Sequence, residues 1–412
     1  MSTSTDYITL PELLSPAGDL TRLKGAVDFG ADAVFLAGEE FGMRTAATNF
    51  GEEDLKLGID YAHAHGVKVH VTCNTIPHNA EMPRLPAFLE RLNELGADAI
   101  IASDLGTMNM VKKYAPNCNL HISVQSGICN YETARAFYDL GAKRVVLARE
   151  LSLDEIAEIR AKTPADLEIE AFAHGAMCVS FSARCLLSSY MTGRDANRGD
   201  CAQSCRWSYS LVEEKRPGQY MDITETDKGT YILNANDMCM AEHLDKMIKA
   251  GVGSLKLEGR AKSHYYTAVV TNAYRGALDS IKANPFDWKC PQWVLEELNK
   301  ISHRTYSTGF YLGVPENSQT YKNAGYVRDY SVAAVVDGYE DGCIIATLKN
   351  KFYSGAELDC LEPKSPPFIV KADNLMNEKG EYIESAPRPM MKIKIPFERP
   401  VKQGSLLRMK AE

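Results

Sequence analysis

Four cysteines lie close together in the middle of the chain and are its clearest candidates for chemistry. They follow the spacing C-x6-C-x15-C-x3-C, and they are Cys178, Cys185, Cys201 and Cys205. The same stretch carries four arginines, which are Arg184, Arg194, Arg198 and Arg206. Thiols at this density have three common explanations, which are a disulfide framework, a structural zinc site and an iron–sulfur cluster.

The sequence argues against disulfides, which leaves a metal site, an iron–sulfur cluster or ordinary buried thiols as explanations. The chain begins MSTSTDYITL, without the basic and apolar regions of a secretory signal, so we expect a reducing, cytoplasmic location. No apolar run could span a bilayer, so we expect no membrane partner. Zinc sites usually pair ligands as C-x2-4-C, and C-x6-C is too wide for that. Irregularly spaced thiolates beside a Gly- and Arg-rich loop favour a 4Fe-4S cluster. Zinc and ordinary buried thiols stay as alternatives, and Cys239 is a fifth candidate ligand.

A repeated pattern predicts the scaffold that positions these cysteines. An amphipathic helix, a glycine and a short apolar strand recur along the first two thirds of the chain. The predicted strand segments begin at Glu12, Gly30, Gly66, Gly96, Asn119, Gly141, Leu167 and Gly251. Such alternation predicts a (β/α)8 TIM-like barrel, with the Cys-rich module following the seventh strand in place of a helix. An open doubly wound sheet is the alternative, but the first strand lacks a G-x-G-x-x-G turn.

Several predicted strands are polar along one face. In LEIEAFAH, for example, Leu167 and Ile169 lie on one face, and the opposite face carries Glu168, Glu170, Phe172 and His174. If the apolar face packs against the surrounding helices, the polar face must line the barrel lumen. The lumen is then either a hydrated, charged cavity or a satisfied network of internal salt bridges.

Barrel enzymes carry their reactive groups at the C-terminal ends of the strands, and polar residues cluster there. We expect Glu170 and His174 to point inward near the mouth as general acid/base candidates. The K-L-E-G-R strand end could hold a carboxylate-bearing small molecule. The candidate catalytic residues are Glu170, His174, Gln125, Lys256, Glu258 and Arg260. The candidate binding residues are Arg44, Asn74 and Arg149. A structural role is the alternative for each residue taken alone.

The run EAFAHGAMCVSFSARCLLS, which begins at Glu170, closely resembles the signature of the collagenase-like peptidase family U32. The segments RDANRGDCAQSCRW, NANDMCM and SLKLEGRAKSHYY match the same family. The resemblance extends from ELLSPAG at Glu12 to the C-terminal β segment. One departure is Ala183, where the family pattern usually has Gly, and we expect it to affect only the local backbone.

The resemblance implies a 4Fe-4S cluster on the four cysteines. It also implies membership of the branch that takes part in prephenate-dependent 5-hydroxylation of the wobble uridine of tRNA. The implied partners are tRNA and a small dicarboxylate such as prephenate, and a partner subunit stays open. The alternatives are a peptidase, an rRNA or quinone hydroxylation factor, and a non-catalytic assembly protein. Proteolysis has no independent support, because the chain has no H-E-x-x-H helix, no G-x-S-x-G elbow and no serine assigned to His174.

Composition and turn patterns set the remaining expectations. The chain has 412 residues, 45% hydrophobic and 24% charged, with a net charge of −8, so no global basic field predicts RNA binding. Residues 388–412 carry seven Lys or Arg against two Glu, either a phosphate-binding patch or a solvated face. We divide the chain into a barrel at 1–285 that includes the Cys-rich module at 174–240, a linker with a short helix at 286–325, and a small all-β barrel at 326–412.

Overall fold

The computed structural model describes residues 9–43, 49–178, 180–181, 185–207, 225–226, 229–230, 236–313 and 329–411. Eight parallel strands close into a barrel, because the last of them pairs with both the first and the seventh. In order around the barrel they are β1 (Glu12–Pro16), β2 (Ala33–Leu36), β3 (Lys68–Cys73), β4 (Ala99–Ala102), β5 (Asn119–Ile122), β6 (Ala142–Val146), β7 (Glu168–Ala176) and β11 (Ser254–Leu257). The predicted (β/α)8 barrel is therefore confirmed.

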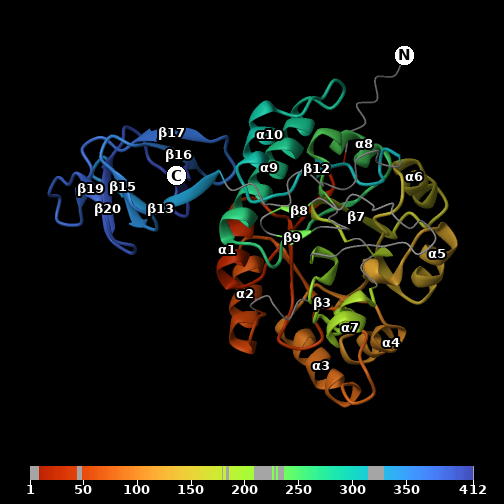
Figure 1. The fold of residues 1–412 in the computed structure, drawn as a ribbon. Coiled ribbons are helices and arrows are strands. Elements are labelled where there is room, and N and C mark those ends of the chain that lie inside the picture. Colours follow the sequence, from red (N-terminus) through yellow and green to blue (C-terminus); the bar gives the residue numbers. More distant parts are fainter. Residues whose placement is uncertain are drawn as a thin grey trace.

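Helices surround the barrel and cover the outer face of its strands (Figure 1). One helix follows each of the first six strands, and a long one follows β11. They are α1 (Leu20–Asp28), α2 (Glu52–Ala64), α3 (Leu85–Leu95), α4 (Leu105–Tyr114), α5 (Tyr131–Asp139), α6 (Leu153–Ala161) and α9 (His264–Ala283). Their ends follow local sequence signals: Gly96 ends α3 in the left-handed conformation, and Ser152 with Glu155 forms a capping box on α6.

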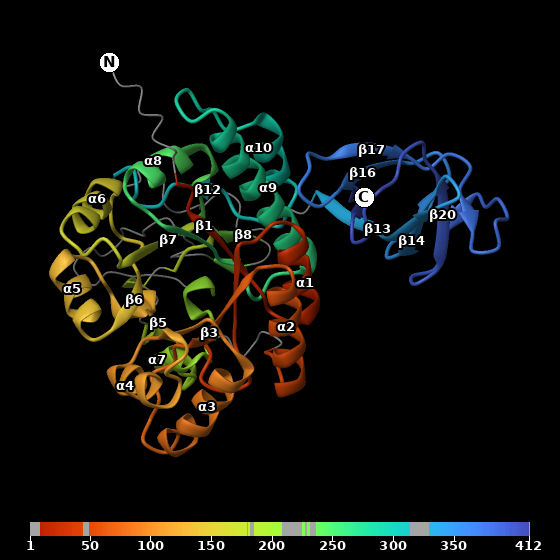
Figure 2. The same cartoon turned by 180° about the vertical axis from the view of Figure 1, so that it is seen from behind.

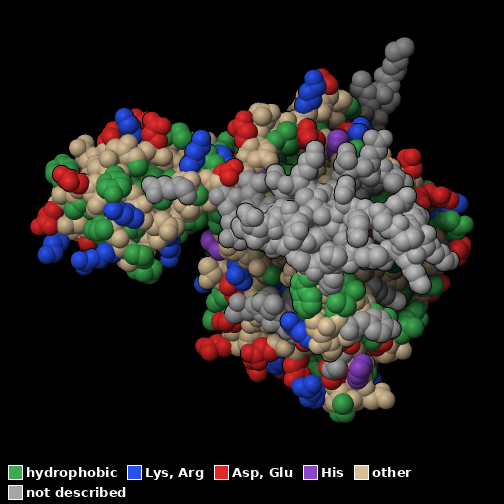
Figure 3. All heavy atoms as spheres, viewed as in Figure 1, with side chains coloured by type: hydrophobic (Ala, Val, Ile, Leu, Met, Phe, Trp, Pro, Cys, Tyr) green, Lys and Arg blue, Asp and Glu red, His purple; other side chains and the backbone are tan. Residues whose placement is uncertain are grey.

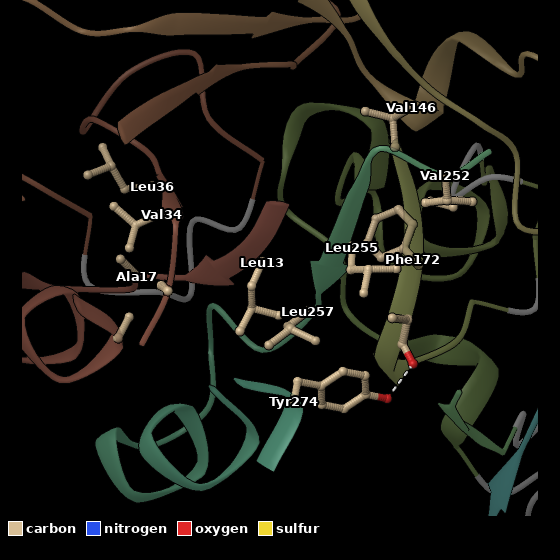
Figure 4. Packing of buried hydrophobic residues seen from close by; sticks show 14 of the residues in the cluster. Leu13, Ala17, Val34, Leu36, Val146, Phe172, Val252, Leu255, Leu257 and Tyr274 are labelled. Atoms are coloured by element: carbon tan, nitrogen blue, oxygen red, sulfur yellow. Dashed lines mark hydrogen bonds between the residues drawn. The ribbon is translucent and has the colours of Figure 1, made fainter. Parts of the chain in front are cut away.

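The strands alternate as the sequence predicts, with apolar side chains outward and polar side chains inward. On β3, Val69 and Val71 are fully buried in the core shared with the helices, whereas His70 and Thr72 face the lumen. Figure 4 shows the outer packing near β1 and β11, where the Tyr274 hydroxyl of α9 donates a hydrogen bond of 2.7 Å to the carbonyl of Ala173. A separate apolar cluster, Leu14, Ala33, Phe35 and Ile101, lies inside the barrel.

Strand β7 continues beyond the barrel and holds both ends of the Cys-rich module. Its last residues pair antiparallel with β10 (Asp237–Cys239), and β10 pairs in turn with β12 (Tyr306–Ser307). The buried Arg304 side chain binds Asp237, with Nε and Nη2 at 2.9 and 2.6 Å from Oδ1. The module therefore leaves β7 after Ala176 and returns to the same ladder at Asp237. It contains α7 (Leu187–Thr192), and α8 (Leu244–Lys249) lies between β10 and β11.

A second, all-β domain lies beside the barrel, next to α9 and α10 (Gln292–Asn299), as both ribbon views show (Figures 1 and 2). Its strands are β13 (Tyr330–Glu340), β14 (Cys343–Leu348), β15 (Phe352–Tyr353), β16 (Glu357–Leu361), β17 (Phe368–Lys371), β18 (Met376–Asn377), β19 (Ser385–Ala386), β20 (Lys392–Pro396) and β21 (Leu406–Lys410). Seven of them form an antiparallel sheet in the order β17-β16-β21-β13-β14-β20-β18. The predicted small β domain is confirmed, in the form of a half-barrel with its own core.

Within the described residues, no helix combines the length and the apolar character that crossing a bilayer requires.

Candidate active site at the mouth of the barrel

A pocket with a cavity volume of about 80 Å³ opens at the C-terminal end of the barrel strands. Six residues that the sequence singled out line it together: Asn74, Gln125, Arg149, Lys256, Glu258 and Arg260. They come from the ends of β3, β5, β6 and β11, so residues far apart in the chain meet at one mouth because parallel strands end on the same side. Arg44, the remaining binding candidate, lies outside the described residues.

The pocket is also lined by residues that the sequence did not assign to the site. Phe35, Thr72, Ser123, Phe172 and Met43 also line it. The sequence does indicate three of these residues, because the period-two alternation of their strands places Thr72, Ser123 and Phe172 on the lumen face. Phe35 gives no such signal, because an aromatic residue in an apolar strand is normally assigned to the outer core.

Three cations and one carboxylate face this pocket. Lys256 Nζ lies 4.5 Å from the ring centroid of Phe35. The guanidinium of Arg149 lies 3.6 Å from the ring centroid of Phe172, and its Nη1 donates to the carbonyl of Ala176 at 2.8 Å. Arg260 Nη1 donates to Thr72 Oγ1 at 2.8 Å. With Glu258 as the only carboxylate in the described lining, the charges favour an anionic ligand with an apolar body.

The amide side chains at the mouth are held by neighbours. Asn74 Oδ1 accepts a hydrogen bond from the backbone N–H of Met43 at 3.1 Å. Gln125 Oε1 accepts from Ser103 Oγ at 3.2 Å, and Gln125 Nε2 lies 2.8 Å from the sulfur of Met43. These contacts fix the orientation of two groups that can bind a polar ligand.

Glu170 faces the lumen as predicted, but it lies below the pocket and does not line it. Its Oε1 accepts from Lys256 Nζ at 2.7 Å, and its Oε2 accepts from Arg144 Nη1 at 3.1 Å. Burial alone would raise the pKa of Glu170, but the charges of Lys256 and Arg144 outweigh burial and lower it. A carboxylate held ionised by two cations is a countercharge, so the geometry does not support a general acid/base role.

The predicted inward orientation of His174 is wrong, because a β-bulge reverses the alternation. Lys256 pairs with Phe172, but the next residue, Leu257, pairs with His174, so β7 has one extra residue at this point. The imidazole consequently lies outside the lumen, where its Nδ1 is 3.4 Å from the hydroxyl of Tyr274. Burial lowers the pKa of His174 to about 3, so the ring is neutral at physiological pH.

The four-cysteine module lies against the rim of the pocket. The backbone N–H of Ile76, just beyond β3, donates to the carbonyl of Asn197 at 3.4 Å. Phe181 lies close to Gly127, in the turn that contains Gln125. Asn197 also bonds to Cys185, with its Oδ1 accepting from the backbone N–H and its Nδ2 donating to the carbonyl. This contact chain connects a cysteine of the module to the end of β3.

The chemistry of the cysteines fits a thiolate-bound group. None of the eleven cysteines, all of which are described, forms a disulfide. The sulfur of Cys185 accepts from the backbone N–H of Leu187 at 3.3 Å, and that of Cys201 from Gln203 at 3.4 Å. Such N–H···S bonds stabilise thiolate ligands. Among the described side chains, no three His, Cys, Asp or Glu converge as a metal site requires, so the 4Fe-4S cluster stays a prediction.

Cys239, the fifth candidate ligand, lies on β10 beside His174, in the ladder where the chain returns to β7. Its sulfur is 3.9 Å from the hydroxyl of Tyr274, and burial raises the pKa of the thiol to about 11. No serine or cysteine is hydrogen-bonded to His174 among the described residues: its Nε2 is buried without a partner and its Nδ1 contacts Tyr274. A nucleophile–base pair of the peptidase kind is therefore not formed by this histidine.

Comparison with known proteins connects this site to a family. The tRNA hydroxylation protein P1 of Bacillus subtilis (strain 168) is 36% identical over 97% of this chain and 94% of its own length. The tRNA hydroxylation protein P of Escherichia coli (strain K12) is 37% identical over 92% of this chain and 91% of its own. A 23S rRNA 5-hydroxycytidine synthase of Escherichia coli (strain K12) is 36% identical over 78% of this chain and 45% of its own.

Two family profiles divide the chain as the two domains do. That of the peptidase family U32 C-terminal domain matches residues 328–408, which form the half-barrel. That of peptidase family U32 itself matches residues 18–321, which include every barrel strand after β1, the four cysteines and the pocket. Since this second match covers most of the sequence, the chain belongs to peptidase family U32.

Proposed function

We propose that this protein is an iron–sulfur enzyme that takes part in hydroxylation of tRNA at the wobble uridine. The observation that carries the proposal is the pocket at the barrel mouth, where Lys256, Arg149 and Arg260 face one cavity beside the four-cysteine module. The relatives named as tRNA hydroxylation proteins support RNA as the substrate. Cytoplasmic action is part of the proposal, and eleven cysteines without a disulfide support it.

The pocket suits a small dicarboxylate such as prephenate. The ammonium and guanidinium groups would bind the carboxylates, while the rings of Phe35 and Phe172 would pack against the apolar body. Asn74 and Gln125 would orient the ligand through their amides. Glu258 is the carboxylate of the described lining that would hold or move a proton. These groups would fix the small molecule and exclude water from it.

Cys178, Cys185, Cys201 and Cys205 would hold the 4Fe-4S cluster. When bound, such a cluster supplies one-electron redox chemistry. The rim contacts of the module with Ile76 and Gly127 would keep that chemistry close to the pocket.

The test is complementation of a bacterial strain that lacks its own tRNA hydroxylation proteins. We expect the wild-type chain to restore 5-hydroxyuridine-derived nucleosides in digested tRNA, measured by mass spectrometry. Lys256→Ala with Arg260→Ala should abolish the nucleoside while the protein stays folded. The matched control is Lys371→Ala, because Lys371 is an exposed lysine of the other domain and should have no effect.

The cluster is tested on the same proteins after anaerobic purification. Wild type should contain about four irons and four sulfides per chain, and Cys185→Ser should lose both iron and tRNA modification. A colourless protein with a single zinc would refute the cluster. Full modification by the Lys256 and Arg260 variant would remove this pocket from the reaction. Peptide hydrolysis that depends on Cys185, without any effect on tRNA, would favour the peptidase alternative.

A further inference from the structure

A second layer of charged side chains lies beneath the pocket, nearer the N-terminal ends of the strands. Its centre is Arg144 on β6, which is 3% exposed. Arg144 Nη1 donates to Glu12 Oε1 at 2.6 Å and to Glu170 Oε2 at 3.1 Å. Arg144 Nε donates to Glu168 Oε2 at 2.7 Å. None of these four residues lines the pocket, and the proposed function assigns them no part.

Glu170 joins this layer to the pocket. It is fully buried, and each of its oxygens accepts from a different cation: Lys256 at 2.7 Å and Arg144 at 3.1 Å. A buried carboxylate beside one cation neutralises that cation, whereas a carboxylate shared by two cations neutralises each of them only in part, so Lys256 keeps part of its positive charge. In a low-dielectric interior that charge acts strongly on its surroundings. Lys256 is the cation on the pocket side.

The carboxylates that balance Arg144 lie on its other side. Glu12 and Glu168 stand near the N-terminal ends of β1 and β7, so they are further from the mouth than Glu170. Burial opposes ionisation of Glu12, but its hydrogen bond with Arg144 and the charge of Arg144 outweigh burial and lower its pKa to about 2. Glu168 has a side chain that is 42% exposed, so solvent screens its charge.

The two histidines in the lumen do not change this balance. His70 and His121 are buried with their ring centroids 4.8 Å apart. Burial lowers the pKa of His70 to about 4 and that of His121 well below its usual value, so both rings are neutral. The charge beneath the pocket is consequently set by Lys256, Arg144 and the carboxylates that pair with them, of which Glu170 is the one in contact with Lys256.

We propose that Arg144 is a positioning residue for the pocket: by sharing the Glu170 carboxylate, it leaves Lys256 with a positive charge directed at a bound anion. The inference uses the pocket of the proposed function, but it does not depend on which anion binds or on RNA. It predicts opposite effects of removing the two buried partners. Loss of the Arg144 charge should weaken anion binding, while loss of the Glu170 charge should not.

The experiment is anomalous diffraction from crystals of the full chain soaked in sodium bromide, with bromide as the anion probe. The wild type should show a bromide peak beside Lys256. Removing Arg144 alone could unfold the chain, so it is replaced in a charge-balanced variant, Arg144→Met with Glu12→Gln. This variant should lose the peak. Glu170→Gln and the charge-conserving Arg144→Lys should both keep it.

Any result other than these overturns the inference. A wild type without bromide at Lys256 means that the floor does not attract anions. An unchanged peak in the Arg144→Met and Glu12→Gln variant means that Arg144 does not supply the charge. Loss of the peak in Glu170→Gln or Arg144→Lys means that the network acts only through packing. A chain that shows the expected bromide pattern but never hydroxylates tRNA would refute the proposed function alone.

Discussion

Glu170 and His174 lie four residues apart on one strand, yet they face opposite sides of it. A regular strand would put both in the lumen, but the extra residue at Ala173 turns His174 toward α9. The result is one carboxylate kept charged by two cations and one imidazole kept neutral by burial. Neither group is suited to exchange a proton with a ligand at physiological pH, so Glu258 is the better candidate for that task.

The neutral state of His174 predicts how stability depends on pH. Its folded-state pKa of about 3 lies below the ordinary 6.5, so below pH 6.5 the unfolded chain binds a proton that the folded chain does not. Stability from this group is present above that pH and is lost as the pH falls toward about 3. Between about pH 7 and about pH 5 the loss should be about 2 kcal/mol. Urea denaturation at both values should show a smaller pH effect in His174→Phe than in wild type.

The control for this measurement is His78→Phe, because His78 is exposed. It should leave the pH effect unchanged. Equal pH effects in His174→Phe and wild type would mean that the buried imidazole takes up a proton in the folded protein.

At the scale of elements, the end of β7 fixes the loop that carries Glu258 and Arg260. The backbone N–H of Glu258 donates to the carbonyl of His174 at 2.8 Å. Gly175 follows with φ +111°, and a Cβ on it would lie 2.2 Å from the carbonyl oxygen of Glu258. Only glycine allows the two backbones to approach so closely.

Gly175→Ala should therefore be far more damaging than another glycine substitution at positive φ. Gly66, with φ +71° and nothing within 4 Å of its would-be Cβ, provides the matched control. We expect Gly66→Ala to lower the free energy of unfolding by about 1 kcal/mol, from backbone strain alone. Gly175→Ala should lower it by about 3 kcal/mol or more, because the clash adds to the strain. Equal losses in urea denaturation would show that the strand end can move without cost.

The sequence could predict those features that depend on one strand at a time. The repeated helix–Gly–strand unit predicted the barrel, and period-two alternation with strand ends predicted Asn74, Gln125, Lys256 and Glu258 at one mouth. It could not predict the bulge, because a bulge is a property of the pairing between β7 and β11. Nor could it predict that Glu170 lies below the pocket, since depth depends on the stagger of strands around the barrel.

At the scale of the whole molecule, a buried ion cluster joins the two domains. Arg408 of β21 is 0% exposed, and its Nη1 and Nη2 lie 2.7 and 3.0 Å from the carboxylate of Glu297 on α10. Its Nη2 also donates to Asp359 at 2.9 Å. The basic run at the C-terminus thus supplies the arginine of this junction. Two other members of the run, Arg399 and Lys402, pair with Glu362. On the visible face of this domain, basic and acidic side chains are interspersed (Figure 3), which favours a solvated face over a phosphate-binding patch.

Breaking this junction should destabilise the protein as a whole. Arg408→Ala leaves the buried Glu297 carboxylate with Lys300, at 2.8 Å, as its remaining cation, and we expect a loss of about 3 kcal/mol in the free energy of unfolding. Lys371→Ala is the control, because its pair with Asp373 is exposed on both sides and should contribute less than about 1 kcal/mol. Similar denaturation midpoints for the two variants would argue that the domains are held together by other contacts.

The β7–β10 ladder holds together the two ends of the segment that carries the four thiols. Because Ala176 and Asp237 are paired, the segment between them is a closed loop whose ends cannot diffuse apart. Bringing thiols of such a loop together loses less chain entropy than it would in an open segment, so a group bound by these thiols would meet a partly preorganised loop. Its length can also change without altering the barrel, since both ends are fixed at neighbouring points of the scaffold. The segment that carries the four cysteines can therefore vary almost independently of the pocket beside it.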